Sequence, residues 1–177
     1  GTEYLQTVIE AMQKSKELIV DYQRFYAHRE TFNIQPYAMK VYHQRWYVVG
    51  YIKELGGIRN IALDRTLEMN LSDISFTLPQ NFNAEKYYAN SIGIYVNEEL
   101  KPTKVKIRAY GKQIEYLRSL PLHSSQKESA SKYGEFCDFE YRLCLTPELS
   151  THILAMGEKV EELEPVDLRE EIKRRLT

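Results

Sequence analysis

Apolar residues recur with two different periods over the first 80 residues of the chain. Between residues 5 and 12 they fall at i, i+3, i+4 and i+7, which predicts a short helix with one apolar face. Apolar and polar residues then alternate in short runs, separated by His43-Gln44 and by Gly56-Gly57, and this alternation predicts strands joined by hairpin turns. The expected strands span residues 18–26, 32–34, 39–42, 46–51, 58–63 and 71–78. Such closely spaced strands favour a small β-barrel.

Beyond residue 102 the pattern changes to strands that alternate with longer helices, which predicts a second unit with a different architecture. Pro147 suits the first turn of a helix, and Gly157 suits the end of the same helix. The predicted order is strand, helix, strand, strand, helix, strand, which is the ferredoxin-like βαββαβ arrangement, and the expected fold class is α+β. The strands are expected at residues 104–109, 122–128, 136–145 and 160–163, and the helices at 111–120, 147–156 and 166–176.

The segment Asn81-Phe82-Asn83 marks a boundary between the two patterns, because polar residues interrupt the alternation there. Asn83 is a suitable N-cap for a short helix that runs through Tyr88. We therefore expect three parts: a first domain with the N-terminal helix and the barrel, a linker with a short helix, and a ferredoxin-like extension. Their expected bounds are residues 1–80, 81–102 and 103–177.

The composition excludes several classes of protein. The 177 residues are 43% hydrophobic with a formal net charge of -1 and a pI near 6.5, so a globally basic surface that coats nucleic acid is not expected. A transmembrane helix needs about 20 apolar residues, and no apolar run in this sequence is that long. The N-terminus also lacks the basic and then apolar pattern of a secretory signal. We expect a soluble, cytoplasmic protein without membrane contact. The helical pattern starts directly after Gly1-Thr2, and we expect a further segment upstream.

The sequence gives no sign of enzyme or metal chemistry. Cys137 and Cys144 fall in one alternating stretch, where about 3.3 Å per residue sets them roughly 23 Å apart on opposite faces, beyond disulfide reach. Packed, reduced thiols are expected, as is usual in the cytoplasm. His28, His43 and His152 lack metal-ligand spacing, and no Walker loop, dinucleotide fingerprint or H-E-x-x-H motif occurs. We expect no catalysis, no metal and no cofactor.

Arginines and tyrosines gather around an apolar centre in the runs 45–51 and 59–65. Arginine binds phosphate through paired hydrogen bonds and aromatic rings stack on nucleobases, so these two strands suit a planar or anionic ligand. On an uninterrupted strand Arg59 and Arg65 share one face and flank an apolar pair. We predict a ligand site near Tyr47, Arg59 and Arg65, with weaker candidates at Arg45, Tyr22 and His43.

Structural roles compete with these ligand roles. Arg65 is equally suited to close the barrel by pairing with a carboxylate. Trp46 favours a core position over a stacking platform because its large surface favours burial.

A basic stripe, defined as Lys104, Lys106 and Arg108, lies on one face of a predicted strand in the second unit. An acidic segment balances it, because residues 158–171 hold seven Asp or Glu against two basic residues. Three roles are open for the stripe: it contacts phosphate, it meets the acidic segment of a partner subunit, or it faces solvent.

Several short motifs resemble, in order, those of the WYL-domain family. The Trp-Tyr-Leu triplet of that family is matched by Trp46-Tyr47-Val48, where Val replaces Leu. Ala62 stands where the family often has a further basic residue, which weakens the case for a strongly anionic ligand. The resemblance covers nearly the whole chain. The other matching motifs are at residues 35–37, 50–51, 58–59, 63–65, 121–126, 153–157 and 164–169.

The resemblance implies an Sm-like, SH3-type small barrel followed by a ferredoxin-like extension, used as the sensory part of bacterial transcriptional regulators. It also implies a homodimer whose N-terminal winged helix-turn-helix binds DNA, although no such motif is visible in this sequence. We predict an effector-sensing module that binds a nucleotide-like or single-stranded nucleic-acid ligand on the barrel. The alternative is a protein-interaction or dimerisation module without a small ligand.

Overall fold

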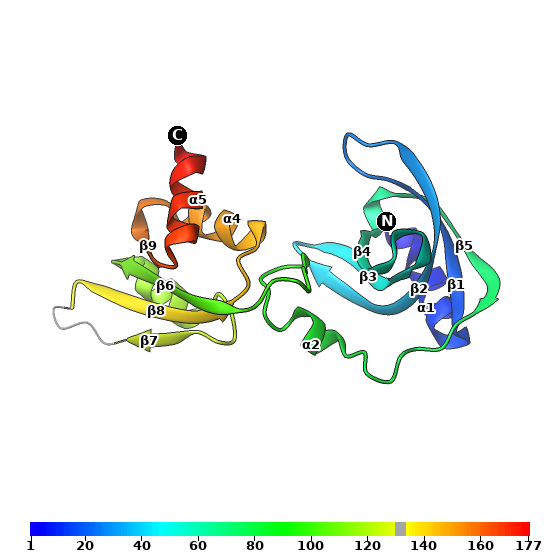
Figure 1. Cartoon of the computed structure of the whole chain (residues 1–177), viewed down its shortest axis with the longest axis horizontal. Helices are drawn as coiled ribbons and strands as arrows, with labels where there is room; N and C mark the ends of the chain where they lie inside the picture. The colour runs from blue at the N-terminus through cyan, green and yellow to red at the C-terminus, as the bar shows by residue number, and fades with distance from the viewer. Residues whose placement is uncertain (130–133) are drawn as a thin grey trace. The chain divides into compact units, whose positions relative to one another are not determined.

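The computed structural model describes residues 1–129 and 134–177 (Figure 1). Its contacts divide the chain into two units, Gly1–Ala84 and Glu85–Thr177, and each unit contains one antiparallel sheet with helices packed against it. The expected α+β class is therefore confirmed. None of the helices in the described residues is long and apolar enough to cross a membrane.

The first unit begins with a short 3-10 turn, η1 (Thr2–Tyr4), and helix α1 (Leu5–Lys14), which Ser15 ends in the left-handed conformation. A five-stranded sheet of order β4-β3-β2-β1-β5 follows, and Figure 1 shows that its strands are strongly curved. Two 3-10 turns, η2 (Lys53–Leu55) and η3 (Leu63–Arg65), flank β4. The strands are β1 (Lys16–Gln23), β2 (Arg29–Tyr42), β3 (Arg45–Ile52), β4 (Gly57–Ala62) and β5 (Thr66–Ser75).

The core of the first unit lies where α1 meets the curved sheet. Val8, which belongs to the predicted apolar stripe of α1, and Ala11, which does not, are both fully buried. They belong to one cluster with inward-facing strand residues such as Val20 and Val48. Trp46 is partly buried and packs against this cluster, which agrees with a supporting role for its ring.

Several strand predictions in this unit are wrong. The strand expected at 18–26 ends at Gln23, and the strand expected at 71–78 is β5, which starts at Thr66 and ends at Ser75. Residues 32–34 and 39–42 were expected to be separate strands, but β2 runs through Pro36 without a break. Pro36 is tolerated because the β2–β3 register shifts between Pro36 and Ala38, so its missing N–H falls at an irregular point of the ladder. The strand expected to reach Leu63 ends at Ala62 and passes into η3, so strand alternation does not extend to Arg65.

The second unit carries a four-stranded sheet of order β7-β8-β6-β9, in which every pairing is antiparallel. One strand prediction is wrong here: of the residues expected at 122–128, only the last two join β7, because side chains of the preceding loop bond locally within it. A short helix, α2 (Ala84–Tyr88), spans the boundary between the units. The remaining elements are β6 (Thr103–Tyr110), α3 (Lys112–Ser119), β7 (Lys127–Ser129), β8 (Phe136–Leu143), α4 (Pro147–Met156), η4 (Gly157–Lys159), β9 (Val160–Glu164) and α5 (Val166–Leu176).

Helices α3, α4 and α5 supply residues to one core on one face of this sheet. Val105 and Ile107 of β6 are fully buried in it, together with Phe139 of β8. Cys137 and Cys144 are both buried and free, which confirms the prediction of packed thiols.

The basic stripe of β6 lies on the opposite face and is neutralised within the chain. Arg108 donates hydrogen bonds of 2.8 and 3.1 Å to Asp138 on β8, and this contact lowers the pKa of that carboxyl. Lys104 lies 3.5 Å from Glu140 and 3.7 Å from Glu164, which belongs to the acidic segment. The stripe therefore meets acidic residues of its own chain.

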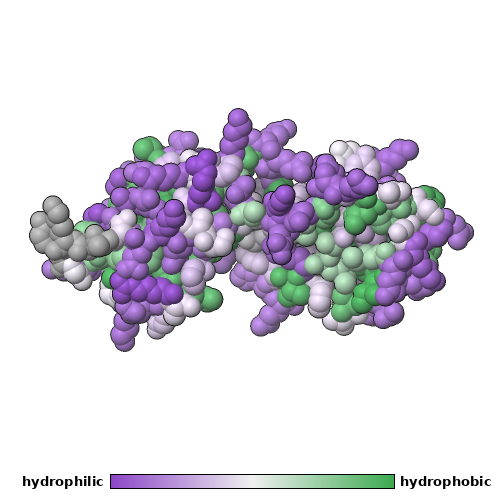
Figure 2. Space-filling view, turned by 90° about the horizontal axis from the view of Figure 1, so that it is seen from below, coloured by the Kyte–Doolittle hydropathy of each residue, from purple (hydrophilic) through white to green (hydrophobic). Residues whose placement is uncertain are grey.

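The surface is mainly polar, with small apolar patches. Figure 2 shows hydrophilic side chains over most of one face, and the broader apolar areas lie over the first unit. Among the exposed apolar side chains of that unit are Phe25, at 64% exposure, and Val41, at 51%. Phe25 lies in the tip that joins β1 to β2.

Candidate functional site

The corner where β4 turns into β5 is fixed by hydrogen bonds from two neighbouring strands. The backbone N–H of Ala62 donates to the hydroxyl of Tyr22 on β1 at 3.0 Å. The hydroxyl of Thr66 donates to the carbonyl oxygen of Ala62 at 3.3 Å. Tyr22 and Thr66 face each other in the β1–β5 register, so one strand pair holds both ends of η3. Tyr22, a predicted ligand residue, thus has a defined structural contact.

Arg65 projects from this corner onto an aromatic ring. Its guanidinium carbon lies 4.0 Å from the centre of the Phe25 ring, a cation–π arrangement. Its Nε is buried and has no hydrogen-bond partner among the described residues. Within the same residues no carboxylate pairs with Arg65. Arg65 thus does not form the barrel-closing ion pair considered above with any described residue. The charge of its guanidinium is available to a ligand.

The other arginines near the β1–β2 tip are already paired. Arg29 hydrogen-bonds to Asp21 and thereby lowers the pKa of that carboxyl. Arg24 lies 3.2 Å from Glu30. Arg24 and Arg29 thus each pair with a carboxylate, whereas Arg65 does not pair with one among the described residues.

Arg45, the first residue of β3, lies at the same corner. Its Nε lies 3.6 Å from a carboxylate oxygen of Asp64, the middle residue of η3. Both side chains are close to half exposed, at 48% and 42%, so solvent screens the pair and its net contribution to stability is small. The pair places Arg45 beside η3 and offsets its charge.

His43 occupies the tight turn that precedes Arg45. His43 and Gln44 have φ values of 49° and 62°, the left-handed conformations that a two-residue hairpin turn requires and that glycine or asparagine usually supplies. The imidazole meets the Tyr42 ring edge to face at 4.1 Å between centres. His43 is thus held at the same end of β3 as Arg45.

Tyr47 and Arg59 lie on opposite faces of the β3–β4 pair. Tyr47 is opposite Ala62, whereas Arg59 is opposite Gly50, and adjacent ladder positions alternate in direction. Tyr47 is only 9% exposed, so little of its ring is open to a ligand. Arg59 is exposed and donates to the carbonyl oxygens of Ile58 and Leu55 at 2.9 and 3.2 Å.

The structure therefore gathers four of the predicted residues around η3 and leaves Arg59 apart from them. Phe25 is the residue that sequence reasoning missed. The available signal was the run Arg24-Phe25-Tyr26, which places two aromatic rings, both exposed, directly after an arginine at a hairpin tip. The four gathered residues are Arg65, Arg45, Tyr22 and Tyr47.

Among the described residues, no group of three or more His, Cys, Asp or Glu side chains is arranged to hold a metal ion. The arrangement around η3 offers a guanidinium and an aromatic ring, which suit binding of a planar or anionic group.

Comparison with solved structures finds two that span most of this chain. One is the proteasome accessory factor B/C (PafBC) of Arthrobacter aurescens, at 20% identity and a TM-score of 0.47, covering 98% of this chain and 26% of that one. The other is described as a CRISPR Cas-related protein, at 11% identity and a TM-score of 0.52, covering 96% of this chain and 48% of that one. This chain thus spans about half or less of either protein. The second likeness extends to the fold alone.

No curated protein matches the sequence significantly. Family models match both parts of it. Residues 3–71 match the WYL domain, and residues 101–177 match the WCX domain. The first match contains α1, the strands β1 to β4, η3 and the first part of β5, and the second contains all of β6 to α5. The chain therefore belongs to the WYL-domain family and carries a WYL domain followed by a WCX domain.

Proposed function

We propose that this chain is the effector-sensing module of a bacterial transcriptional regulator, and that its WYL domain binds a nucleotide-like or single-stranded nucleic-acid ligand at η3. The observation that carries the proposal is Arg65, whose guanidinium stacks on Phe25 while lacking a carboxylate among the described residues. An arginine in this state can bind a phosphate oxygen through its outer nitrogens, and Phe25 can stack on a base. We propose no catalytic role.

We propose a fold for each domain from the order of the strands in its sheet. The order β4-β3-β2-β1-β5 after an N-terminal helix supports an Sm-like barrel for residues 1–80. The order β7-β8-β6-β9 with helices on one face supports a ferredoxin-like extension for residues 103–177. Residues 81–102 are proposed as the linker between them.

The proposed ligand contacts differ in strength. Arg65 and Phe25 form the centre, and Arg45 forms one edge because its ion pair with Asp64 holds it beside η3. His43 is a further proposed contact, from the tight turn that precedes Arg45. Tyr22 and Tyr47 contribute mainly by supporting the corner, since their rings are buried. Arg59 remains a proposed contact for a ligand long enough to reach the far end of β4.

Ligand binding would be transmitted through η3. η1, at the start of the chain, contacts η3, and the backbone of Gly1 lies close to that of Asp64. A ligand that prefers one position of η3 would shift the position of η1 and so of a DNA-binding unit joined upstream. We further propose that the protein is cytoplasmic, forms a homodimer and binds DNA through that upstream unit.

Fluorescence anisotropy with a labelled single-stranded oligonucleotide, and calorimetry with mononucleotides, test the proposal. Arg65→Ala is expected to weaken binding by about 1–3 kcal/mol, or roughly five- to 150-fold. Arg65→Lys retains the charge but loses the planar fork and most of the stacking, so a substantial part of the same loss is expected. Arg59→Ala is expected to have a smaller effect.

Arg169→Ala is the matched control, because Arg169 is an exposed arginine on α5 of the second unit. Equal affinity of the wild type and an Arg59→Ala, Arg65→Ala double variant would remove the proposed site. If the chain instead captures a protein partner without nucleic acid, and the double variant does so equally well, the interaction-module alternative stands.

A further inference from the structure

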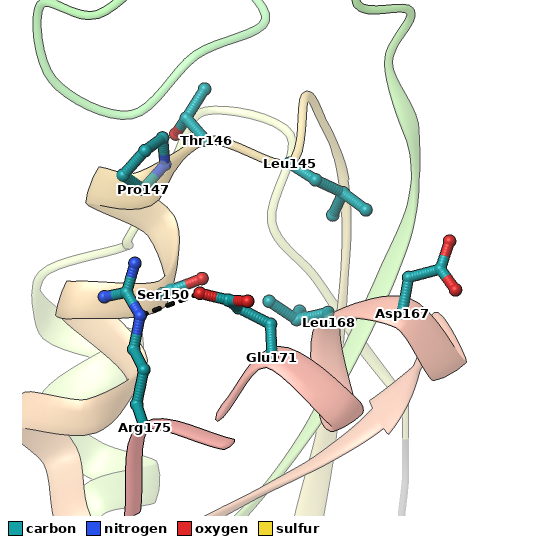
Figure 3. A pocket seen from close by; sticks show the side chains of 8 residues that line it. All are labelled: Leu145, Thr146, Pro147, Ser150, Asp167, Leu168, Glu171 and Arg175. Atoms are coloured by element: carbon teal, nitrogen blue, oxygen red, sulfur yellow. Dashed lines mark hydrogen bonds and ion pairs between the residues drawn. The ribbon is translucent and has the colours of Figure 1, made fainter. Parts of the chain in front are cut away.

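A cavity of about 270 Å³ lies in the second unit between the first turn of α4 and one face of α5 (Figure 3). Its volume is close to the lower end of the range, about 300–1,000 Å³, that is typical of small-molecule sites. Leu145 and Leu168 give it an apolar wall, and Ser150, Asp167, Glu171 and Arg175 give it polar groups. The cavity belongs to the WCX domain and is independent of the η3 site.

Ser150 brings an unpartnered polar group to this cavity. The residue is only 3% exposed, yet its hydroxyl has no hydrogen-bond partner among the described residues. A serine or threonine within a helix often bonds to the carbonyl four residues earlier, as the Thr151 hydroxyl does with Pro147 at 3.0 Å. Figure 3 shows the Ser150 side chain pointing from α4 towards α5. Its hydroxyl is therefore available to a ligand.

The charges around the cavity favour a cation. Glu171 is already engaged, because it ion-pairs with Arg174 and accepts a 2.9 Å hydrogen bond from Arg175. Asp167 is exposed and has no ion pair among the described residues. With Glu171 and Arg175 paired, Asp167 is the unpaired charge among the described residues that line the cavity, and it is negative.

We propose that this cavity binds a small linear amino alcohol, with its ammonium group at Asp167, its methylene chain on Leu145 and Leu168, and its hydroxyl at Ser150. Figure 3 shows Asp167 and Ser150 on opposite sides of Leu168, so a ligand that meets both must cross the apolar wall. The paired Glu171 and Arg175 form a neutral side of the site. A carboxylate in place of the ammonium group would be repelled by Asp167.

Amide NMR of the whole chain tests the proposal with 5-amino-1-pentanol as the probe. The probe is expected to shift the amides of residues 145–150 and 167–175, whereas 1,5-pentanediol should bind more weakly and 5-hydroxypentanoate weaker still. Asp167→Asn is expected to weaken binding of the probe about two- to fivefold, the range for an exposed ion pair. Ser150→Ala is expected to weaken it about two- to tenfold through the lost hydrogen bond.

Glu170→Gln is the control for charge, because it removes one negative charge from the neighbouring residue, which does not line the cavity. It should leave probe affinity unchanged, and so should Arg65→Ala in the other unit. The proposal is overturned if the carboxylate probe binds best, if Asp167→Asn behaves like Glu170→Gln, or if the amino alcohol shifts none of these amides.

Discussion

Tyr22→Phe tests whether a single hydroxyl holds the η3 corner in place. The Tyr22 ring is only 4% exposed and meets Phe32 edge to face at 5.8 Å, and a phenylalanine keeps that packing. The substitution removes only the oxygen that accepts the N–H of Ala62 at 3.0 Å. Any change therefore reports on one hydrogen bond.

The expected magnitude follows from the burial of the donor. Ala62 is 1% exposed, so water cannot readily replace the lost acceptor, and an unsatisfied buried donor costs about 1–3 kcal/mol. Tyr4→Phe is the control, because the Tyr4 hydroxyl donates to the carbonyl of Leu67 in an exposed position at 2.9 Å. Water can replace that bond, and the expected loss is at most about 0.5 kcal/mol.

Amide hydrogen exchange measured by NMR is the suitable assay, because a chain of two units need not unfold in a single step. A loss of about 1–3 kcal/mol should accelerate exchange of the Ala62 amide roughly five- to 150-fold in Tyr22→Phe. Exchange at Ala62 no faster than in Tyr4→Phe would refute the reasoning. Weaker ligand binding with unchanged protection would instead make the Tyr22 hydroxyl a ligand contact.

Three further experiments test packing and electrostatics elsewhere in the chain. A Cβ on Gly50 would lie 2.0 Å from the carbonyl oxygen of Gln35, so Gly50→Ala should lower the free energy of unfolding by at least about 2 kcal/mol in urea titrations. Burial raises the pKa of Cys137 to about 11, so its thiol should react with Ellman's reagent at pH 8 only after unfolding. The hydrogen bond from Arg108 lowers the pKa of Asp138, so its contribution to stability is complete above the ordinary value of about 3.9 and is lost as pH falls through the lowered one. Asp138→Asn should remove that part of the acid dependence of the urea midpoint.

Hydrophobic periodicity predicted the elements whose faces are sharply amphipathic. In β6, buried Val105 and Ile107 alternate with charged residues, so period two identified both the strand and its buried face. The stripe on α1 was equally clear. Periodicity failed at Pro36, because the register shift that makes a proline acceptable depends on the partner strand.

The site was less predictable because its residues meet through tertiary structure. Strand alternation placed Arg59 and Arg65 on one face, but η3 replaces the strand after Ala62 and redirects Arg65. The approach of Phe25 to Arg65 depends on the long β1–β2 hairpin, whose tip returns to the β4–β5 corner. The acidic partners of the basic stripe come from β8 and β9, so their register with β6 could not be read from local sequence.

The charge balance around η3 leads to a prediction about salt. Arg45 is offset by Asp64, and Ala62 supplies no charge, so within the part of the chain that the structure describes Arg65 carries the unpaired positive charge of the corner. Each phosphate contact with a single strand contributes a slope of about -0.7 in log K against log salt. One such contact predicts a slope near -0.7 for an oligonucleotide, falling towards zero in Arg65→Ala. A slope steeper than about -2 that survives Arg65→Ala would mean that phosphates bind a different basic surface. A shallow slope lost in Arg65→Ala but kept in Arg59→Ala would place the phosphate at η3.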